Sequence, residues 1–392
     1  MTDFKTIRQY NFPTVIRFGA GAIGELPGHL VANGLSRPLL VTDPMVAGLR
    51  FFGEIRRALE AKGISVVVFS DIHKNPVKSD VLKGGEAYAA AGRDSVIGIG
   101  GGAAMDVARA VVLRVHHPRD LFDYDDLIGG DQYVTEEVPY FITVPTTAGT
   151  GSEVGRSAII SEDDTHRKRI LFSPKLLAKI VFADPLLTME LPPFVTAATG
   201  MDALTHNLEA YLAKMYHPMC EGIALEGVVL INGSLADAVH RPDLESRSRM
   251  LLGSLMGAVA FQKGLGVVHS LAHPLSSLLD THHGLANAVN LPYGMRFNIG
   301  GNEEKFRRIA LVMGLPVEPG GETPDRSAGA AVVERLFAFN KEVGLPVRLR
   351  DIGVREEHIE TLADLAIADF AHPNNPKPVS REDFKKLYSE AL

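Results

Sequence analysis

The first half of the chain alternates short apolar runs with helical stretches. Runs rich in Val and Ile, ended by Gly, Asp or Thr, predict strands at Val15–Phe18, Pro38–Asp43, Ser65–Asp71, Ser95–Gly100 and Tyr140–Thr147. The spacing between them predicts helices at Phe51–Lys62, Lys78–Ala91 and Ala103–Val115. Strand–helix alternation is typical of a parallel sheet covered by helices on both faces, and ligands of such sheets bind at the carboxyl ends of the strands.

The pattern changes after Asp184-Pro185. Pro192-Pro193 begins a long series of helical segments, and strand signals nearly vanish. The predicted helices are Val195–Lys214, Pro218–Val239, Leu244–Gln262, Asn302–Val312, Ala328–Val343 and Glu356–Ala368. A length of 392 residues suggests two domains at roughly 150 residues each. We therefore predict an α/β domain at residues 1–185 and an all-α domain at residues 186–392.

Composition narrows the function classes. A formal net charge of -7 argues against broad binding to nucleic acid or anionic membranes, because both need a concentrated basic surface. Cys220 is the single cysteine, which excludes an intramolecular disulfide framework and a cysteine-based zinc cluster. The N-terminal segment lacks a signal-peptide pattern, and no apolar run approaches the roughly 20 residues that span a bilayer. We expect a cytoplasmic protein that binds neither nucleic acid nor membranes.

Two glycine-rich segments are candidates for dinucleotide binding. Gly19–Gly24 is a formal GxGxxG match after a predicted strand, but this pattern specifies function loosely, and a tight strand-to-helix turn is the better interpretation. Gly100-Gly101-Gly102 precedes a predicted helix, whose N-terminus adds partial positive charge where backbone amides can point at a phosphate. We favour phosphate binding there, because a bare turn needs fewer glycines.

Polar residues follow two other predicted strands. Asp43 could accept hydrogen bonds from a ribose diol and would repel a 2′-phosphate, which favours NAD over NADP. A helix N-cap ahead of Pro44 is an equally open interpretation. The segment Pro145–Glu153 carries four hydroxyls and two glycines that could bind ribose, phosphate or nicotinamide, and a plain polar loop is its alternative.

The second half contains donors for a metal ion. Asp202 and His206 are spaced i,i+4 on a predicted helix and share one face. His269 and His273 repeat this spacing, and His282-His283 follows shortly after. One carboxylate with several imidazoles is a normal donor set for Fe(II) or Zn(II). A single histidine is more simply a core or surface residue, but burying this many imidazoles without a shared partner would be costly.

Four stretches resemble, in order and approximate spacing, the iron-containing (group III) alcohol dehydrogenases: GIGGGAAMD, PTTAGTGSEV, ATGMDALTHNLEAY and GLGVVHSLAHPLSSLLDTHHGLANA. The resemblance covers nearly the whole chain. It implies an NAD-binding α/β domain at residues 1–185, a helical metal-binding domain at 186–392, and a cleft between them that holds NAD and metal. Dimers are common in the family, so we expect a homodimer, although the sequence itself shows no interface signal.

The resemblance assigns the metal ligands to Asp202, His206, His269 and His283. It corrects the local interpretation of the i,i+4 spacing, because His273 then lines the site and relays a proton. A proline disfavours helical conformation at the residue before it. We therefore interpret His273-Pro274 as a helix boundary, after which the chain can bring His283 back to the metal. His282 departs from the commoner pattern, and His283 takes the ligand role by alignment to the following glycine.

The same resemblance implies where NAD binds. Its phosphates would lie on Gly101 and Gly102, with Asp106 just below, and Asp43 would bind the adenosine ribose. Thr146, Thr147 and Lys168 would line the cofactor channel. The Gly19–Gly24 segment is not the family's phosphate loop. Ala103 stands where many relatives have Ser, which removes one hydroxyl contact without abolishing the loop.

Together these implications predict an NAD-dependent, metal-dependent alcohol dehydrogenase that interconverts a small primary alcohol or diol and its aldehyde. The cation would be Fe(II), with Zn(II) as the alternative. Metal coordination can lower the pKa of water from about 15.7 to about 7, and an alcohol should respond similarly. His273 would then carry the released proton towards solvent.

Other functions stay open at this level. Within the family they are a polyol dehydrogenase, a hydroxyacid–oxoacid transhydrogenase, or a reductase of an anionic semialdehyde recognised by Arg156 or Lys263. A solvated surface charge is the simpler interpretation of each cation. From another class, a metal-dependent hydrolase or lyase on an α/β scaffold would not need the triple glycine or Asp43.

Overall fold

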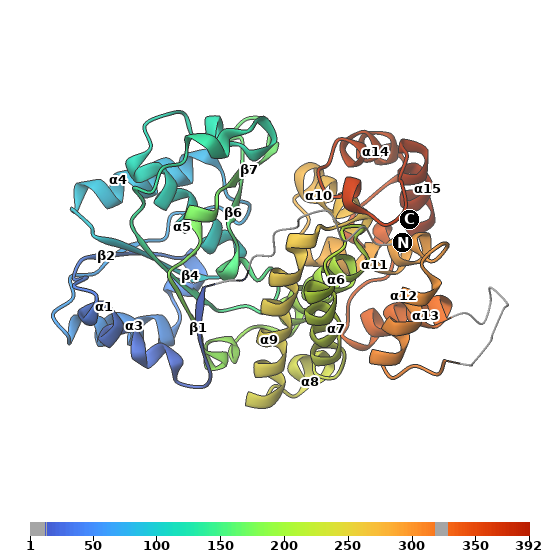
Figure 1. Ribbon diagram of the computed structural model, residues 1–392, viewed down its shortest axis with the longest axis horizontal. Coiled ribbons are helices and arrows are strands. Elements are labelled where there is room, and N and C mark those ends of the chain that lie inside the picture. The colour runs from blue at the N-terminus through green and yellow to red at the C-terminus, as the bar shows by residue number, and fades with distance from the viewer. Residues whose placement is uncertain (1–11, 13, 318–327) are drawn as a thin grey trace. The chain divides into compact units, whose positions relative to one another are not determined.

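The computed structural model describes residue 12 and residues 14–317 and 328–392, and within them the chain divides into two compact units. The α/β unit comprises residues 14–147 and Gly151–Glu190 (Figure 1). The helical unit comprises, among the described residues, Phe12, Ala148–Thr150 and residues 191–317 and 328–392. The division therefore falls after Glu190 rather than after residue 185, and a short piece of the PTTAGTGSEV segment belongs to the helical unit.

The α/β unit contains a six-stranded sheet in the order β1-β8-β5-β4-β2-β3, and all neighbouring strands are parallel. Its strands are β1 (Val15–Phe18), β2 (Pro38–Val41), β3 (Val67–Phe69), β4 (Ser95–Gly100), β5 (Tyr140–Pro145) and β8 (Ile180–Ala183). The helices are α1 (Leu26–Ala32), α2 (Pro44–Ala47), α3 (Arg50–Glu60), α4 (Lys78–Ala90) and α5 (Gly102–His116). The predicted α/β fold with a parallel sheet is confirmed.

Alternation along the central strands builds two apolar cores. In β2, Leu39 and Val41 join the core that contains residues of α4 and α5, whereas Leu40 joins the core that contains residues of α1 and α3. These two pairs of helices lie on opposite faces of the sheet (Figure 1). Because both faces are buried, the strands have few polar positions, and polar chemistry is left to their carboxyl ends.

Sequence analysis missed two parts of this unit. Strand β8 lies between β1 and β5, but its four residues form a short apolar run without alternation, which periodicity cannot assign. Strands β6 (Ser157–Ser161) and β7 (Lys168–Phe172) form an antiparallel hairpin outside the main sheet. Strand β6 has Ser at both ends and β7 begins with Lys168 and Arg169, so each strand contains only a short apolar run.

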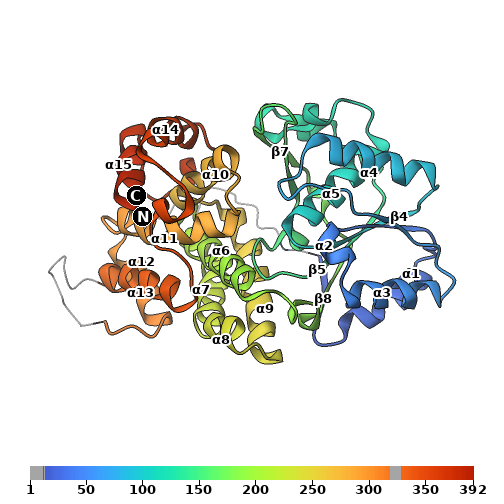
Figure 2. The same ribbon diagram turned by 180° about the vertical axis from the view of Figure 1, so that it is seen from behind.

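The second unit is helical in its described residues, as predicted. Its helices are α6 (Pro193–Leu212), α7 (Pro218–Asn232), α8 (Leu235–His240), α9 (Leu244–Ala260), α10 (Val267–Leu279), α11 (His283–Asn298), α12 (Glu303–Val312), α13 (Ala328–Glu342), α14 (Ile359–Ile367) and α15 (Arg381–Ala391). Every residue of α6 from Thr196 to Leu212 is buried. This helix packs against α7, α9 and α11, as Figure 2 shows from behind. Polar residues on α6 therefore face protein rather than water.

Two predicted helix boundaries are wrong. The predicted helix Pro218–Val239 is broken into α7 and α8 at Gly233-Ser234, where neither residue favours a helix interior. The expected boundary at His273-Pro274 lies inside α10, which continues to Leu279 and is followed by its C-cap Asp280, with φ 51°. A proline within a helix costs about 3 kcal/mol, because a backbone donor is lost. Burial of Val267, Leu271 and Leu275 on the same helix offsets that cost.

Among the described residues, no single helix has both the length and the apolar content needed to cross a membrane. One pair of helices, Leu244–Lys263 and Val267–Leu279, meets that test only jointly and is bent by 106°.

Candidate functional site

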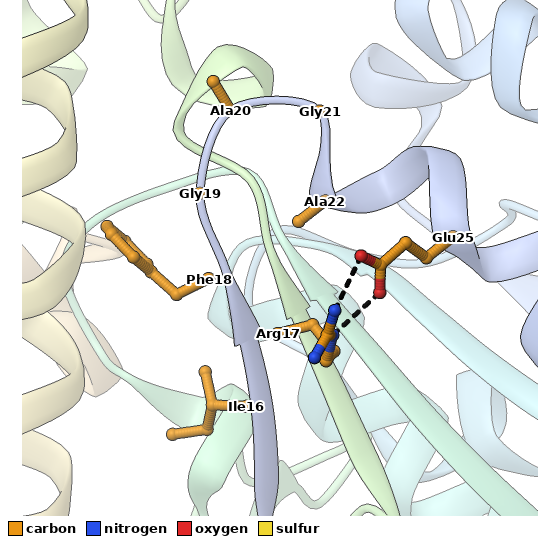
Figure 3. A pocket seen from close by; sticks show the side chains of 8 residues that line it. All are labelled: Ile16, Arg17, Phe18, Gly19, Ala20, Gly21, Ala22 and Glu25. Atoms are coloured by element: carbon orange, nitrogen blue, oxygen red, sulfur yellow. Dashed lines mark hydrogen bonds and ion pairs between the residues drawn. The ribbon is translucent and has the colours of Figure 1, made fainter.

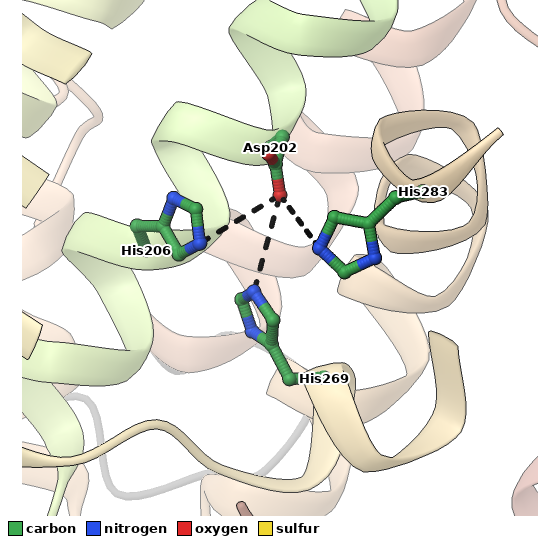
Figure 4. A group of neighbouring side chains, drawn as sticks. All are labelled: Asp202, His206, His269 and His283. Atoms are coloured by element: carbon green, nitrogen blue, oxygen red, sulfur yellow. Dashed lines mark ion pairs between the residues drawn. The ribbon is translucent and has the colours of Figure 1, made fainter. Parts of the chain in front are cut away.

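Four polar side chains converge inside the helical unit (Figure 4). Asp202 and His206 come from α6, His269 from α10, and His283 is the first residue of α11. Their donor atoms all lie within 4.8 Å of one another. The Nε2 atoms of His206, His269 and His283 lie 3.8, 3.9 and 3.5 Å from Oδ1 of Asp202. The structure therefore brings together the four residues that the resemblance implied as ligands.

The donor set fits a divalent cation. Zinc binds imidazole nitrogen and carboxylate oxygen at about 2.1 Å in a tetrahedron, so neighbouring donor atoms are about 3.4 Å apart. The three distances from Asp202 Oδ1, 3.5 to 3.9 Å, are slightly longer than this, and all four donor atoms lie within 4.8 Å of one another, so the donors would have to move inward to bind one cation. Asp202 is 1% exposed, and a buried carboxylate is costly unless it is paired or bound to a metal. A cation at the centre would offset that cost.

The ring of His206 is oriented by a backbone carbonyl from the PTTAGTGSEV segment. Its Nδ1 donates to Gly149 O at 3.3 Å, and Ser254 Oγ donates to the same oxygen at 3.1 Å. Gly149 cannot be larger, because a Cβ atom there would lie 2.8 Å from Thr199 Cβ. Burial lowers the pKa of His206 to about 4, so the ring is neutral near pH 7 and its Nε2 lone pair faces the cluster.

His269 is oriented by a buried carboxylate that sequence analysis missed. Its Nδ1 donates to Glu209 Oε2 at 2.6 Å, and Glu209 Oε1 accepts from Val268 N at 2.7 Å. Burial alone would lower the pKa of His269, but the hydrogen bond to Glu209 and nearby carboxylates raise it above its usual value. Glu209 lies two turns after Asp202 on α6, within the quoted stretch ATGMDALTHNLEAY. Helical spacing was the signal that could have found it.

The two adjacent histidines at the start of α11 have different roles. His282 is the N-cap of α11, and its Nδ1 accepts from Leu285 N at 3.4 Å. His283 instead turns into the cluster (Figure 4). One turn further, Asn287 Nδ2 donates to Asp202 Oδ1 at 2.7 Å and lies 3.1 Å from His283 Nε2. Sequence analysis did not identify Asn287, which holds the carboxylate beside the imidazoles.

His273 lies one turn after His269 on α10 but is not one of the four clustered donors. Its ring stacks on that of His283, with centroids 5.3 Å apart. Its Nδ1 donates to Asp369 Oδ2 at 2.8 Å. The i,i+4 spacing alone had placed His273 among the ligands, and the structure instead puts it beside them.

The triple glycine joins β4 to α5 in the α/β unit. Gly100 has φ 151°, and a Cβ atom there would lie 2.7 Å from Ala104 Cβ, so only glycine fits this turn. Gly101 is the N-cap of α5, and no side chain caps that end of the helix. The first amides of a 15-residue helix thus lack a side-chain partner, an arrangement suited to a phosphate.

Asp43 and the paired threonines lie next to this turn. Asp43 Oδ1 accepts from Val46 N at 2.9 Å and caps α2, whereas its Oδ2 would lie 3.3 Å from a Cβ atom at Gly100. Thr146 N donates to Gly100 O at 3.0 Å, and the side chain of Thr147 would lie 3.3 Å from a Cβ at Gly101. The carboxyl ends of three adjacent strands therefore bring together an acid, glycines and hydroxyls.

Asp106 is engaged by the β6–β7 hairpin rather than by the glycine turn. It accepts from Ser152 Oγ at 2.8 Å and from Ile159 N at 3.1 Å. Burial raises its pKa, against the opposing charges of Arg109 and Lys168. Asp106 on α5 is therefore linked to the segment that carries Ser152 and to β6, and the positive charge of Lys168 on β7 acts on it.

The Gly19–Gly24 segment forms a tight turn at the end of the edge strand β1 (Figure 3). Gly19 and Gly21 have φ of 139° and 84°, and a short 3-10 helix, Ala22–Glu25, follows. Both oxygens of Glu25 accept from Arg17 at 2.7 Å. The backbone geometry agrees with a tight turn between β1 and the short 3-10 helix.

The two cations considered for substrate binding have different surroundings. Lys263 is fully buried, and its Nζ donates to Glu221 Oε1 and to Tyr211 O, both at 2.8 Å. It is therefore neither a solvated surface charge nor available to an anionic substrate. Arg156 is half-buried, with its guanidinium over the Phe172 ring at 5.5 Å. Within the described residues, no carboxylate forms an ion pair with Arg156.

Comparisons with known proteins identify the same family over nearly the whole chain. Residues 13–185 match the family model described as iron-containing alcohol dehydrogenase, and residues 196–392 match the C-terminal model of the same family. The 4-hydroxybutyrate dehydrogenase of Cupriavidus necator is 37% identical over 97% of this chain and 98% of its own length.

Solved structures of alcohol dehydrogenases and aldehyde reductases have the same fold as this chain. A 1,3-propanediol oxidoreductase superposes with a TM-score of 0.92 at 32% identity, over 98% of this chain and all of that chain. The sulfoacetaldehyde reductase of Bifidobacterium kashiwanohense, solved in complex with NAD+, superposes with a TM-score of 0.87 at 26% identity, over 98% of this chain and 99% of that chain.

Proposed function

Because the chain belongs to the iron-containing alcohol dehydrogenase family, we propose that it transfers a hydride between NAD and a small primary alcohol or diol. We propose a single divalent cation, Fe(II) or Zn(II), held by Asp202, His206, His269 and His283. The observation that carries this proposal is the convergence of those four donor atoms within 4.8 Å. A hydrolase or lyase would not need the glycine turn that precedes α5.

A bound cation would supply a Lewis acid for the alcohol oxygen, and NAD would supply the hydride acceptor. The residues of this chain supply orientation and proton transfer. Gly149 and Glu209 hold two of the imidazoles by Nδ1, so that Nε2 points into the cluster. His273, beside the cluster, is the residue that we expect to relay the proton released by the substrate hydroxyl towards solvent.

Binding of NAD is proposed at the carboxyl ends of β2, β4 and β5. The pyrophosphate would lie on the amides of Gly101 and Gly102, and Asp43 would accept hydrogen bonds from the adenosine ribose through Oδ2. Thr146 and Thr147 would border the cofactor. The support is their common location around Gly100 and Gly101.

An anionic aldehyde is the second candidate substrate class. It is favoured by the names of two relatives, a 4-hydroxybutyrate dehydrogenase and a sulfoacetaldehyde reductase, which both act on molecules with a negative charge. Arg156 is the remaining cation that could pair with such a group. The engaged Lys263 is not proposed for this role.

The test is NADH formation across short alcohols, diols and ω-hydroxy acids, with enzyme reconstituted separately with Fe(II) and Zn(II). We expect turnover with at least one cation and none after chelation. A preference for ω-hydroxy acids that disappears in Arg156→Gln would identify an anionic aldehyde as the substrate class. Equal turnover of neutral diols would identify a small neutral alcohol or diol instead. Turnover by metal-free enzyme would contradict the proposal. Cytoplasmic location and dimeric assembly stay predictions from the sequence.

A further inference from the structure

The imidazole of His273 is held on three sides. Its Nδ1 donates to Asp369 Oδ2 at 2.8 Å, and Asp369 lies in the loop that follows α14. The ring of Phe370 stacks on it with centroids 5.3 Å apart and an interplanar angle of 29°. The ring of His283 stacks on it with centroids also 5.3 Å apart and an angle of 15°. Two consecutive residues, Asp369 and Phe370, thus bind one edge and one face of the same ring.

Asp369 is itself fixed. Its Oδ1 accepts from Ser270 Oγ at 2.6 Å and from Ala371 N at 2.9 Å. The hydroxyl of Ser270 in turn accepts from His372 N at 2.9 Å. Burial alone would raise the pKa of Asp369, but the contacts with His273, Ser270 and Ala371 hold it below the usual value. The carboxylate is therefore ionised near pH 7 and cannot rotate without breaking these contacts.

The contacts determine which nitrogen of a neutral His273 carries the proton. An ionised carboxylate accepts hydrogen bonds only, so the imidazole must present Nδ1–H to it. The lone pair is then on Nε2. An imidazole with the opposite tautomer could not accept a proton at Nε2, and it would place two lone pairs against each other at Nδ1.

We propose, building on the proposed function, that Asp369 and Phe370 are positioning residues that hold His273 with Nε2 ready to accept the proton of the substrate hydroxyl. In the proposed reaction, Nε2 of His273 would gain the proton as the O–H bond of the alcohol breaks, and bound NAD would supply the acceptor for the hydride from the alcohol carbon. The imidazolium that results has its charge balanced by Asp369. Solvent then takes up the proton, and the neutral ring returns with Nδ1–H.

The variant Asp369→Asn tests this assignment. If the carboxamide oxygen stays with Ser270 and Ala371, its NH2 group faces His273 and forces the wrong tautomer. We expect kcat to fall by about 10²- to 10⁴-fold, the usual contribution of a positioned base. KM for alcohol, the dissociation constant for NAD and the metal content should change little. Asp364→Asn is the matched control, because that exposed acid on α14 pairs with Arg381 and not with the site.

A double-variant comparison separates positioning from a structural role. In a His273→Ala background, Asp369→Asn should lower kcat by less than about threefold, because residues that act through one another are not additive. A further loss as large as in the wild-type background would overturn the proposal. An inactive wild-type enzyme would instead refute the proposed function, so the two failures are distinguishable.

The wild-type protein allows a test that needs no folded variant at Asp369. Long-range ¹H–¹⁵N spectra of the histidine side chains report which ring nitrogen carries the proton, and His273→Ala identifies the signal. We expect Nδ1–H for the neutral ring. Detection of Nε2–H at His273 would overturn the proposal whatever the kinetics show. Phe370→Leu, which keeps an apolar side chain but removes the stacked ring, should lower kcat less than Asp369→Asn does.

Discussion

Glu209 should control the affinity of the helical unit for its metal. The carboxylate accepts from His269 Nδ1 at 2.6 Å, from Val268 N at 2.7 Å and from His269 N at 3.4 Å. It therefore joins α6, which carries two proposed ligands, to the first turn of α10, which carries a third. In Glu209→Gln, one side of the amide becomes a donor and must face either a backbone N–H or the imidazole Nδ1–H.

The expected loss can be worked out from this geometry. Outer-shell partners of metal-binding histidines contribute about 10- to 100-fold in affinity. That range corresponds to about 1.4 to 2.7 kcal/mol, since each tenfold change is about 1.4 kcal/mol. Glu209→Gln also removes a negative charge near the cation, which acts in the same direction. We expect the dissociation constant for Zn(II) to rise by at least tenfold.

The assay is competition between metal-free enzyme and a chelator of known affinity. Glu221→Gln is the control, because Glu221 is a partly buried carboxylate that pairs with Lys263 and Lys305 away from the cluster. Thermal unfolding of the metal-free proteins shows whether a variant is simply misfolded. A Zn(II) affinity of Glu209→Gln within twofold of wild type, with normal unfolding, would refute the role that we assign to this carboxylate.

Two further outcomes are expected in the α/β unit. Glu153 is buried, its Oε1 has no hydrogen-bond partner in the described residues, and burial raises its pKa from 4.5 to about 7. The folded state then binds more protons between those pH values, so stability falls as pH rises from about 4.5 through about 7. The difference between the two pKa values corresponds to at most about 3.4 kcal/mol of stability. Glu153→Gln should therefore be more stable than wild type in urea at pH 8 but not at pH 4, and equal effects at both would contradict this. Asp43→Asn should keep the cap of α2, because Asn is as good an N-cap as Asp, while removing the charge that disfavours a 2′-phosphate. We expect unchanged unfolding and an activity with NADP, relative to that with NAD, that rises at least tenfold. An unchanged ratio of the two activities would contradict the proposal that Asp43 binds the ribose.

Sequence patterns were most informative where chemistry and local spacing coincide. The i,i+4 pair Asp202 and His206 lies on one buried helix face, and the glycines before α5 form the turn between strand and helix. Long central strands were found because their residues are β-branched and bounded by turn residues. Strand β8 was missed because its four residues are all apolar and show no alternation of apolar and polar side chains.

What could not be predicted depends on contacts between distant parts of the chain. Glu209, Asn287 and Asp369 act through hydrogen bonds to residues 18 to 96 positions away or on other helices, and no local pattern marks such partners. Gly149 was interpreted as part of a cofactor loop, yet its carbonyl orients His206. Pro274 was interpreted as a helix end, but packing of α10 outweighs the missing donor.

The most direct measurement is the metal content and NADH formation of His269→Ala beside wild type. Removing one of four convergent donors should leave less than a tenth of an equivalent of bound cation and no detectable NADH, because the remaining three cannot hold it tightly. Affinity for NAD should stay within about threefold, since the proposed phosphate turn belongs to the other unit. A stoichiometric cation and normal turnover in His269→Ala would contradict the assignment of this cluster as the metal centre.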